Sequence, residues 1–520
     1  MEIPTLPPME IPTLPTTIAP IVFACLTMLA TISFLYFYAP YWQVRKVPGP
    51  PTIPFLGHLH LLAIYGPDIF IHLAKRYGPI FRFHLGRQPL VIVADTDLCR
   101  EVAIKKFKEM PNRSVIAPLS GSPILAKGVA MARDMEWSTI RNTMTSLYQP
   151  THISSQLPLM KSAVDTLVSN LSNLEQKEVN FSDLSIRLTT DTLGQSAFGI
   201  DFGLSKSGQH ANNLASDFIY SVTELKMGLN ASLSVIIGLL FPIFQAPSRQ
   251  ILQRIPWTLD WKLNQVSKKL TSEADDIVTR RSNECADRNQ SKDFLTLILN
   301  AKKSEKASKD IFTADRISAL CYEHFLAGSV STSFALNSVL YLVSHHPPVE
   351  AKLLKEIDYF GPHIPTAEDL LQKFPYLNQV IKETMRVYFA SPLNAREASR
   401  NVEIGGYFLP KGTCVWLAPG VPAKDPKHFP EPEQFKPERF DSDCEEEKQR
   451  HPYAFMPFGI GPRACMGQNF AMQELRHAVF HLYKDFIFRH SPNMEKPLAL
   501  EYGIILGFKH GVKLEVIKRK

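Results

Sequence analysis

Residues 458–467, FGIGPRACMG, carry the spacing Phe-x-x-Gly-x-Arg-x-Cys-x-Gly, which suits a loop that presents one cysteine to a metal ion. As a thiolate, Cys465 could bind the iron of haem b, push electron density onto it and favour cleavage of an O–O bond. The residues that follow, QNFAMQELRHAVFHLY, predict a helix, so Cys465 lies just before a helix N-terminus. We expect the dipole and free N–H groups of that helix to lower the pKa of the thiol.

The other fixed positions of this loop fit the same chemistry. Gly461 and Gly467 permit backbone bends and a close approach to a flat macrocycle. Arg463 offers a cation to a haem propionate, and Phe458 packs beside the sulfur and limits water. The alternative is a buried structural cysteine in a Gly/Pro turn. With every fixed position filled, the loop resembles the haem-binding signature of the cytochrome P-450 superfamily.

A long helix is predicted to pass over this loop. Thr313 can cap it, and it runs to Ser344, where His-His-Pro-Pro stops it. Within it, Ala327 and Gly328 leave a notch without long side chains, where a diatomic ligand could sit over the iron. Packing against another helix is the alternative explanation of these small residues. In the P-450 resemblance, this is the oxygen-binding helix.

The sequence departs from the superfamily just after that notch. The usual pattern is Ala-Gly-x-Asp/Glu-Thr, but here Val330 replaces the acid and Ser331 the threonine, with Thr332 next. Delivery of protons to the oxygen site would therefore fall to Ser331, Thr332 and ordered water.

A second pair of residues could contact the haem edge. Asp134 can cap a helix that Pro150 ends, and this helix carries Trp137 and Arg141 one turn apart on one face. By themselves these two residues indicate a surface cation–π contact equally well. The P-450 resemblance makes them a Trp-x-x-x-Arg motif whose arginine meets one propionate, and makes Arg396 the partner of the second.

Three charged residues far apart in the chain form a candidate structural triad. Pro375 can start a helix that bears Glu383 and Arg386, an i,i+3 pair that is common on solvated helices. The P-450 resemblance joins Arg439 to this pair and makes the three a buried group that braces the haem loop. Because buried charges must be satisfied internally, we expect loss of one member to prevent haem retention.

Residues after this helix are predicted to line the substrate pocket. They are Leu393, Asn394 and Ala395, with Ile505 near the C-terminus. Asn394 could donate a hydrogen bond to the substrate, or it could satisfy its own loop.

Composition sets broad limits on the function. The chain has 520 residues, 45% of them hydrophobic, and no linker divides it after about residue 55, which favours one large domain. Its formal net charge of +7 is spread along the chain without a basic run, so nucleic acid is not expected as a partner. Its 7 cysteines are scattered, which argues against a disulfide framework or a zinc site.

The N-terminus predicts a membrane anchor. Residues 1–17 hold a tandem copy of MEIPTLP and are expected to be disordered. Residues 18–39 carry no charge and are long enough to cross a bilayer, although a cleaved signal peptide is the alternative. Arg45 and Lys46 follow this span, so the positive-inside rule places the catalytic domain, residues 45–520, in the cytosol. The proline-rich residues 47–54 resemble the hinge of microsomal cytochromes P-450, which implies the endoplasmic reticulum.

The remaining pattern predicts a mainly α fold with small β-sheets. Residues 80–85 and 90–94 predict a hairpin, and strands are expected near residues 402–417 and 504–516. This matches the cytochrome P-450 fold, preceded by one transmembrane helix. Residues 231–244 carry no charge and predict a buried helix, or, by the resemblance, a segment that dips into the membrane.

The whole chain shows a narrower resemblance. Runs such as LTTDTLGQSAFGIDFGLS, IFTADRISALCYEHFLAGS and HPYAFMPFGIGPRAC are similar to the plant carlactone oxidases, the more-axillary-growth cytochromes P-450 of strigolactone biosynthesis. This resemblance implies stepwise oxidation of the methyl group of carlactone, an apolar apocarotenoid, to carlactonoic acid, and in some members onward to 4-deoxyorobanchol or orobanchol.

The same resemblance implies that dioxygen is used and that electrons come from NADPH through a membrane-bound cytochrome P-450 reductase. Arg450 and Arg476 are candidates for steering that acidic partner. Alternatives are another terpenoid or fatty-acid-derived substrate, an oxygen-independent isomerase, and a non-enzymatic haem carrier or gas sensor.

Overall fold

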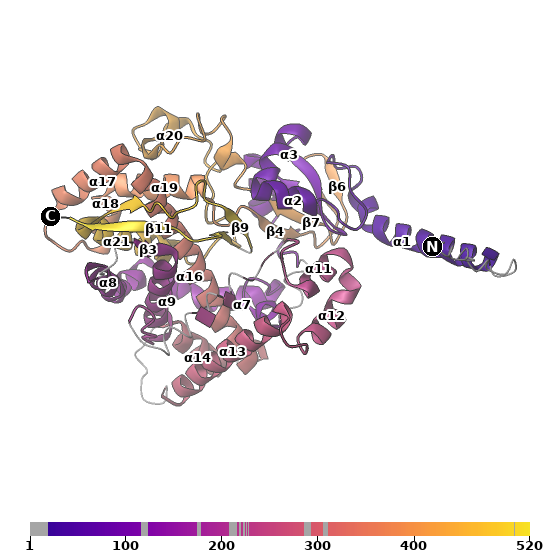
Figure 1. The fold of residues 1–520 in the computed structure, drawn as a ribbon, viewed down its shortest axis with the longest axis horizontal. Coiled ribbons are helices and arrows are strands. Elements are labelled where there is room, and N and C mark those ends of the chain that lie inside the picture. Colours follow the sequence, from indigo (N-terminus) through magenta and orange to yellow (C-terminus); the bar gives the residue numbers. More distant parts are fainter. Residues whose placement is uncertain are drawn as a thin grey trace, which may run out of the picture.

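The computed structural model describes residues 19–115, 123–173, 178–206, 228–284, 293–304, 310–503 and 505–519, together with residues 216, 217, 220, 221, 224 and 226. The predicted disordered repeat lies outside these residues. Figure 1 shows a body of packed helices and short strands, from which the N-terminal helix α1 projects. The expected class, mainly α with small sheets and one preceding apolar helix, is confirmed.

The body is built around helix α16 (Ala314–His345). Thr313 caps it as predicted, since its side chain accepts a hydrogen bond from the N–H of Arg316, and the helix ends one residue beyond the predicted Ser344. The largest apolar core lies between α16 and several other helices, among them α8 (Pro150–Ser172), α17 (Pro347–Phe360), α19 (Pro375–Val387) and α21 (Gln468–Asp485). Helix α9 (Phe181–Phe198) also packs along α16 and adds Phe181 and Leu188 to this core.

A four-stranded sheet lies next to the N-terminal segment of the body. Its order is β1 (Ile80–Leu85), β2 (Gln88–Val93), β7 (Cys414–Leu417) and β4 (Asn394–Glu397). The predicted hairpin is confirmed: β1 and β2 are antiparallel with Ile80 opposite Val93, and the second strand begins two residues earlier than expected. Gly86 permits the tight turn between these strands because it adopts a positive φ of 58°.

The predicted strands near the C-terminus are also present. The smaller sheets pair β5 (Val402–Ile404) with β6 (Tyr407–Leu409), β9 (Leu500–Tyr502) with β10 (Leu506–Phe508), and β11 (Lys513–Lys518) with both β3 (Glu178–Asn180) and β8 (Phe486–His490). The remaining helices are α2 (Leu59–Tyr65), α3 (Ile69–Tyr77), α4 (Thr96–Arg100), α6 (Pro123–Lys127), α7 (Asp134–Thr145), α11 (Leu233–Leu240), α12 (Gln245–Leu252), α13 (Leu259–Glu284), α14 (Phe294–Ser304), α18 (Ala367–Gln372) and α20 (Glu445–Gln449).

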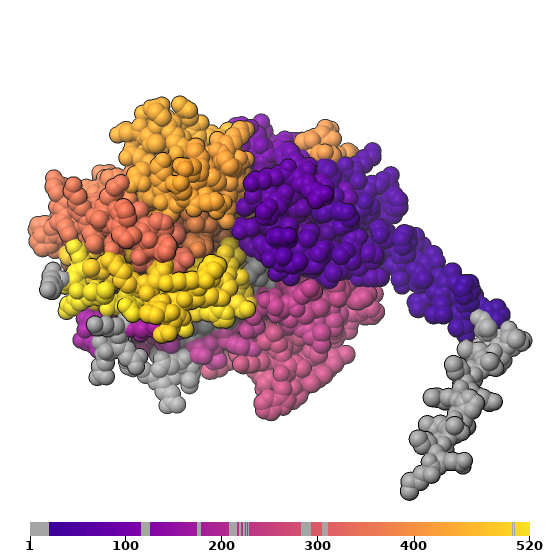
Figure 2. Space-filling view, turned by 45° about the horizontal axis from the view of Figure 1, so that its top comes forward, coloured from indigo at the N-terminus to yellow at the C-terminus, as the bar shows by residue number. Residues whose placement is uncertain are grey.

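Helix α1 (Ala19–Val44) extends away from the body, as Figure 2 also shows. It is long and apolar enough to cross a membrane, and almost all of it is exposed. Helix α16 is also long and apolar enough to cross a membrane, but most of it is buried, as expected of a core helix. Helix α1 continues past the predicted limit at residue 39, and its last residue, Val44, packs into the body.

The uncharged residues 231–244 form α11 and a short 3₁₀ turn. Val235 and Leu239 are buried, whereas Ile243 and Phe244 are 63% and 54% exposed. The predicted burial therefore holds for one face of this segment, and an apolar surface remains on the other.

Candidate functional site

A cavity of about 350 Å³ lies between α16, α7 and the loop before α21. It brings together residues that the sequence analysis took from five separate parts of the chain. The predicted residues that line it are Trp137, Arg141, Ala327, Gly328, Ser331, Thr332, Asn394, Phe458, Arg463, Cys465, Gly467 and Ile505.

Cys465 faces this cavity from the loop that precedes α21. Its N–H donates to the carbonyl of Phe458 at 2.9 Å, and Gly467 is the N-cap of α21, so the predicted position before a helix N-terminus is confirmed. Burial raises the pKa of the Cys465 thiol, while the N–H groups of Gly467 and Gln468 and the guanidinium of Arg141 act in the opposite direction. The N–H groups at the helix start therefore lower the pKa as predicted, but burial has the larger effect in the protein without a bound metal. A bond to iron would itself hold the sulfur as a thiolate.

Gly461 has a different neighbour from the predicted one. Its φ is +75°, and a Cβ there would lie 3.0 Å from the carbonyl carbon of Ala103 and closer still to its oxygen. Its close approach is therefore to a backbone turn at Glu101–Lys105, and Gly461 does not line the cavity. At Gly467, by contrast, the nearest atom to an added Cβ is Tyr148 Cε1 at 3.6 Å.

An unusual concentration of arginines surrounds the cavity. Arg463 is buried, donates to the carbonyls of Pro111 at 2.9 Å and Ala132 at 3.0 Å, and lies 4.0 Å over the Trp137 ring. Arg141 donates to the carbonyl of Ala464 at 2.9 Å. The predicted Trp137 and Arg141 therefore both reach the cysteine loop.

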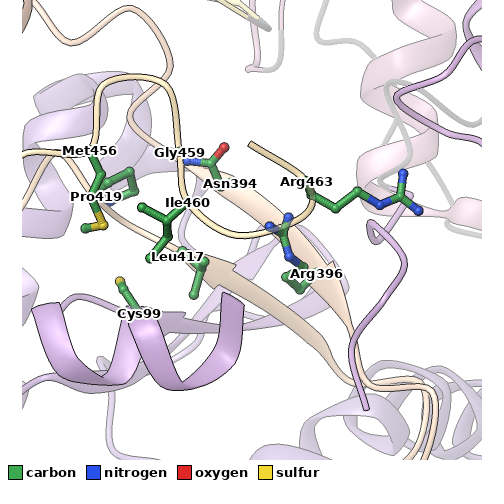
Figure 3. A pocket seen from close by; sticks show the side chains of 9 residues that line it. All are labelled: Cys99, Asn394, Arg396, Leu417, Pro419, Met456, Gly459, Ile460 and Arg463. Atoms are coloured by element: carbon green, nitrogen blue, oxygen red, sulfur yellow. The ribbon is translucent and has the colours of Figure 1, made fainter. Parts of the chain in front are cut away.

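Arg396 does not line the main cavity; it lies in a smaller adjoining pocket. Figure 3 shows it with Asn394 on β4, beside the loop that carries Gly459 and Arg463. Burial, together with neighbouring guanidinium groups, lowers the pKa of both Arg396 and Arg463 to about 9. Among the described residues, Nε of Arg396 and Nη1 of Arg463 are buried without a hydrogen-bond partner.

These orphaned donors test whether the site fits haem b. Buried cations without a carboxylate partner are costly, so the cluster requires an anionic group. The two propionates of a haem would supply that charge, with Cys465 offering the sulfur ligand from the same cavity. The residues present therefore fit the group.

The structure corrects the predicted start and end of α7. Asp134 is its first residue rather than its cap, and the cap position, Arg133, makes no side-chain capping bond. The N–H of Asp134 instead donates to Asn112 Oδ1 at 2.9 Å, so a distant segment satisfies this helix end. Helix α7 ends at Thr145, and Pro150 begins α8.

On α16, the small residues have two neighbours. Ala327 and Gly328 line the cavity, but a Cβ on Gly328 would also come within 2.8 Å of Leu193 on α9, which supports the packing explanation. Ser331 Oγ donates to the carbonyl of Ala327 at 2.7 Å. Val330 packs beside the apolar cluster of α9 and α13 and does not line the cavity.

The predicted triad forms as expected. Glu383 accepts from Arg386 at 2.7 and 2.9 Å and from Arg439 at 3.1 Å, and all three side chains are fully buried. Arg386 also donates to the carbonyl of Ala423, and Arg439 to that of Pro430. The triad therefore ties α19 to the segment that leads toward the cysteine loop.

Two other predictions were wrong. Leu393 and Ala395 do not line the cavity but pack against the apolar cluster around β1 and β2, because alternate residues along a strand face opposite sides. Arg450 cannot steer a partner, since its side chain is 5% exposed and paired with Glu446 and Glu447. Arg476 is partly buried and donates to Asn378, which also weakens the case for it.

Sequence reasoning missed five polar residues of the cavity: Arg113, Tyr148, Glu323, His324 and Tyr388. Tyr148 Oη lies 3.3 Å from His324 Nδ1, and burial lowers the pKa of His324 to about 4. Helical spacing could have indicated Glu323, which precedes Ala327 by one turn. Arg113 and Tyr148 gave no comparable signal.

Comparisons with known proteins agree with this site. The family model described as cytochrome P-450 matches residues 47–512. Thromboxane-A synthase from Sus scrofa is 28% identical over 90% of this chain and 91% of its own length. Cytochrome P-450 3A13 from Mus musculus is 30% identical over 95% and 96% respectively, and cytochrome P-450 3A9 from Rattus norvegicus is 29% identical over the same shares.

The chain belongs to the cytochrome P-450 family. Membership implies a haem iron and supports a monooxygenase, in agreement with the cysteine and arginines described above. The relatives named here are animal proteins, so the narrower resemblance to plant carlactone oxidases stays a prediction.

Proposed function

We propose that this protein is a haem-thiolate monooxygenase of strigolactone biosynthesis that oxidises the methyl group of carlactone stepwise to carlactonoic acid. Onward conversion to 4-deoxyorobanchol or orobanchol belongs to the same proposal. The observation that carries the monooxygenase is Cys465 facing a largely apolar cavity beneath α16. The substrate rests on the sequence runs that resemble the carlactone oxidases.

The residues of the site have separate roles in binding the haem and excluding water. Cys465 would hold the iron, while Arg141, Arg396 and Arg463 would neutralise the propionates. Trp137 and Phe458 exclude water from the haem edge and the sulfur. When bound, the haem supplies the activation of dioxygen.

Proton movement must use alcohols and water, because position 330 is a valine. Ser331 Oγ is hydrogen-bonded to the carbonyl of Ala327, so it must turn from this carbonyl to donate into the cavity. The neighbouring Thr332 also lines the cavity and can share this role with ordered water.

We further propose that α1 anchors the protein in the endoplasmic reticulum membrane with the body in the cytosol. The exposed apolar length of α1 and the basic Arg45 and Lys46 after its apolar span support this orientation. The exposed Ile243 and Phe244 would add a second contact with the same membrane. Deletion of residues 1–44 should release much of the protein into the soluble fraction, unless that second contact suffices to hold it.

Electrons would come from NADPH through a membrane-bound cytochrome P-450 reductase. The deciding experiment therefore supplies carlactone and labelled dioxygen to microsomes that contain this protein and the reductase. Carlactonoic acid carrying labelled oxygen would support the proposal. Absence of any oxidised product, with the haem-thiolate spectrum intact, would show that carlactone is not the substrate and direct attention to other terpenoid or fatty-acid-derived substrates.

A second candidate is a cytochrome P-450 that rearranges a peroxide without dioxygen. Val330 at the acid position favours it, since such a reaction does not need the usual proton delivery to bound dioxygen. The labelling experiment separates the two, because an isomerase incorporates no label.

A further inference from the structure

Glu323 is the one carboxylate among the described residues that line the cavity. Its side chain is 7% exposed, so the protein keeps an acidic group in a largely apolar space. Burying a carboxylate is costly unless its oxygens are hydrogen-bonded. We therefore expect the buried carboxylate of Glu323 to have a function in the cavity.

The carboxylate of Glu323 is fixed by the backbone opposite. The N–H of Ala130 donates to Oε1 at 2.8 Å, and the N–H of Val129 donates to Oε2. The absence of a side chain at Gly128 leaves room for this carboxylate, because a Cβ there would lie 2.5 Å from Glu323 Cδ. Two N–H donors suit an ionised carboxylate, which only accepts hydrogen bonds and retains further lone pairs for a ligand.

Helix α16 places Glu323 in the lining of the cavity that contains Cys465. Glu323, Ala327 and Ser331 follow one another at i, i+4 and i+8 on α16, and all three line the cavity with Cys465. Burial raises the pKa of Glu323, whereas the N–H groups of Ala130 and Val129 and the positive charge of Arg113, which also lines the cavity, act in the opposite direction and favour the ionised carboxylate.

We propose that Glu323 sets the ligand class of the cavity: it accepts a hydrogen bond from hydroxyl-bearing ligands and repels ligands that carry a carboxylate. This inference rests on the proposed function in one respect, namely that the same cavity takes the substrate. In a stepwise oxidation, an alcohol intermediate donates to Glu323 and is retained. The final acid is ionised and is repelled by a like charge, which favours its release.

Equilibrium binding to the full-length, haem-loaded protein tests this without turnover. The probes are retinol and retinoic acid, an apocarotenoid alcohol and its acid, titrated by the shift of the haem absorption band in the absence of reductase. We expect the wild type to prefer retinol by roughly tenfold, which is the effect of one hydrogen bond to a charged group. Glu323→Gln should bring the ratio close to one, chiefly because retinoic acid binds more tightly.

Two further variants separate charge from structure. Glu323→Asp keeps the charge but shortens the reach to the backbone, so it should still disfavour retinoic acid. Glu474→Gln is the matched control, because Glu474 is a buried glutamate of α21 that does not line the cavity, and its ratio should equal that of the wild type. The thiolate spectrum of the carbon monoxide complex verifies that each variant is folded and haem-loaded.

An unchanged ratio in Glu323→Gln would overturn the assignment, and so would an equal loss of preference in Glu474→Gln. Neither result bears on carlactone oxidation, which is measured separately by product formation. Conversely, Glu323→Gln could lose the preference for retinol as expected while the wild type fails to oxidise carlactone. That result would refute the proposed substrate and leave the role of Glu323 in place.

Discussion

Gly461 offers a sharp test of how the cysteine loop is held. In Gly461→Ala, the new Cβ would sit on a backbone with φ of +75°, which costs a non-glycine residue about 1–2 kcal/mol. It would also overlap the carbonyl of Ala103, and the backbone shift needed to relieve this costs about 1–3 kcal/mol more. We therefore expect a loss of roughly 2–5 kcal/mol of stability together with a displaced loop.

The matched control lies in the same loop. Gly467 has φ of −81°, and an added Cβ would find its nearest neighbour at 3.6 Å, so Gly467→Ala should change stability by less than about 1 kcal/mol. Thermal unfolding of both full-length variants, with the carbon monoxide spectrum as the measure of thiolate ligation, compares them directly. If Gly461→Ala proved as stable as Gly467→Ala, the reasoning from Ala103 would be refuted.

Three other perturbations probe different parts of the molecule. Glu383→Gln removes the carboxylate paired with Arg386 and leaves Arg439 paired with Glu446, so we expect a loss of about 3–5 kcal/mol and poor haem retention; a normal haem content after purification would contradict this. Burial lowers the pKa of His477 to about 3, so the unfolded chain binds a proton that the folded one refuses, and stability should fall as the pH drops below about 6.5. Between pH 7 and pH 5 this amounts to about 2 kcal/mol, and His477→Leu should flatten the acid side of the thermal-stability profile; an equally steep profile would exclude His477 as a source. Combined Ser331→Ala and Thr332→Ala changes should increase NADPH consumption per product formed, whereas unchanged coupling would show that water alone carries the protons.

The fold features that sequence predicted well depend on neighbours in the chain. The β1–β2 hairpin and the Thr313 cap each rest on residues within a few positions of one another. The triad of Glu383, Arg386 and Arg439 was also correct, but through the family resemblance, since the spacing of Glu383 and Arg386 equally fits an exposed helix.

The errors arise where a distant segment changes the environment. Asp134 was expected to cap α7, yet Asn112 from an earlier segment takes up its N–H. Arg450 was read as a surface cation, but Phe429 and Phe440 lie under its guanidinium at 4.3 and 4.9 Å. Helical spacing places Glu323 one turn before Ala327, but the partners that hold its carboxylate, Val129 and Ala130, lie more than 190 residues away in the chain. The spacing of residues along one helix gives no information about contacts with such distant segments.

The arginine cluster links folding to the cofactor. Arg396 and Arg463 are buried with donors that lack partners in the described part of the chain, and each lies near other guanidinium groups that lower its pKa. Such a cluster destabilises the body until an anion enters, so a haem with two propionates contributes to the stability of the fold as well as to its chemistry. Since Arg463 lies two residues before Cys465 and Arg396 is on β4, the same ligand would join the cysteine loop to the sheet. The same loop also packs tightly against the backbone of Ala103 at Gly461, where glycine alone fits.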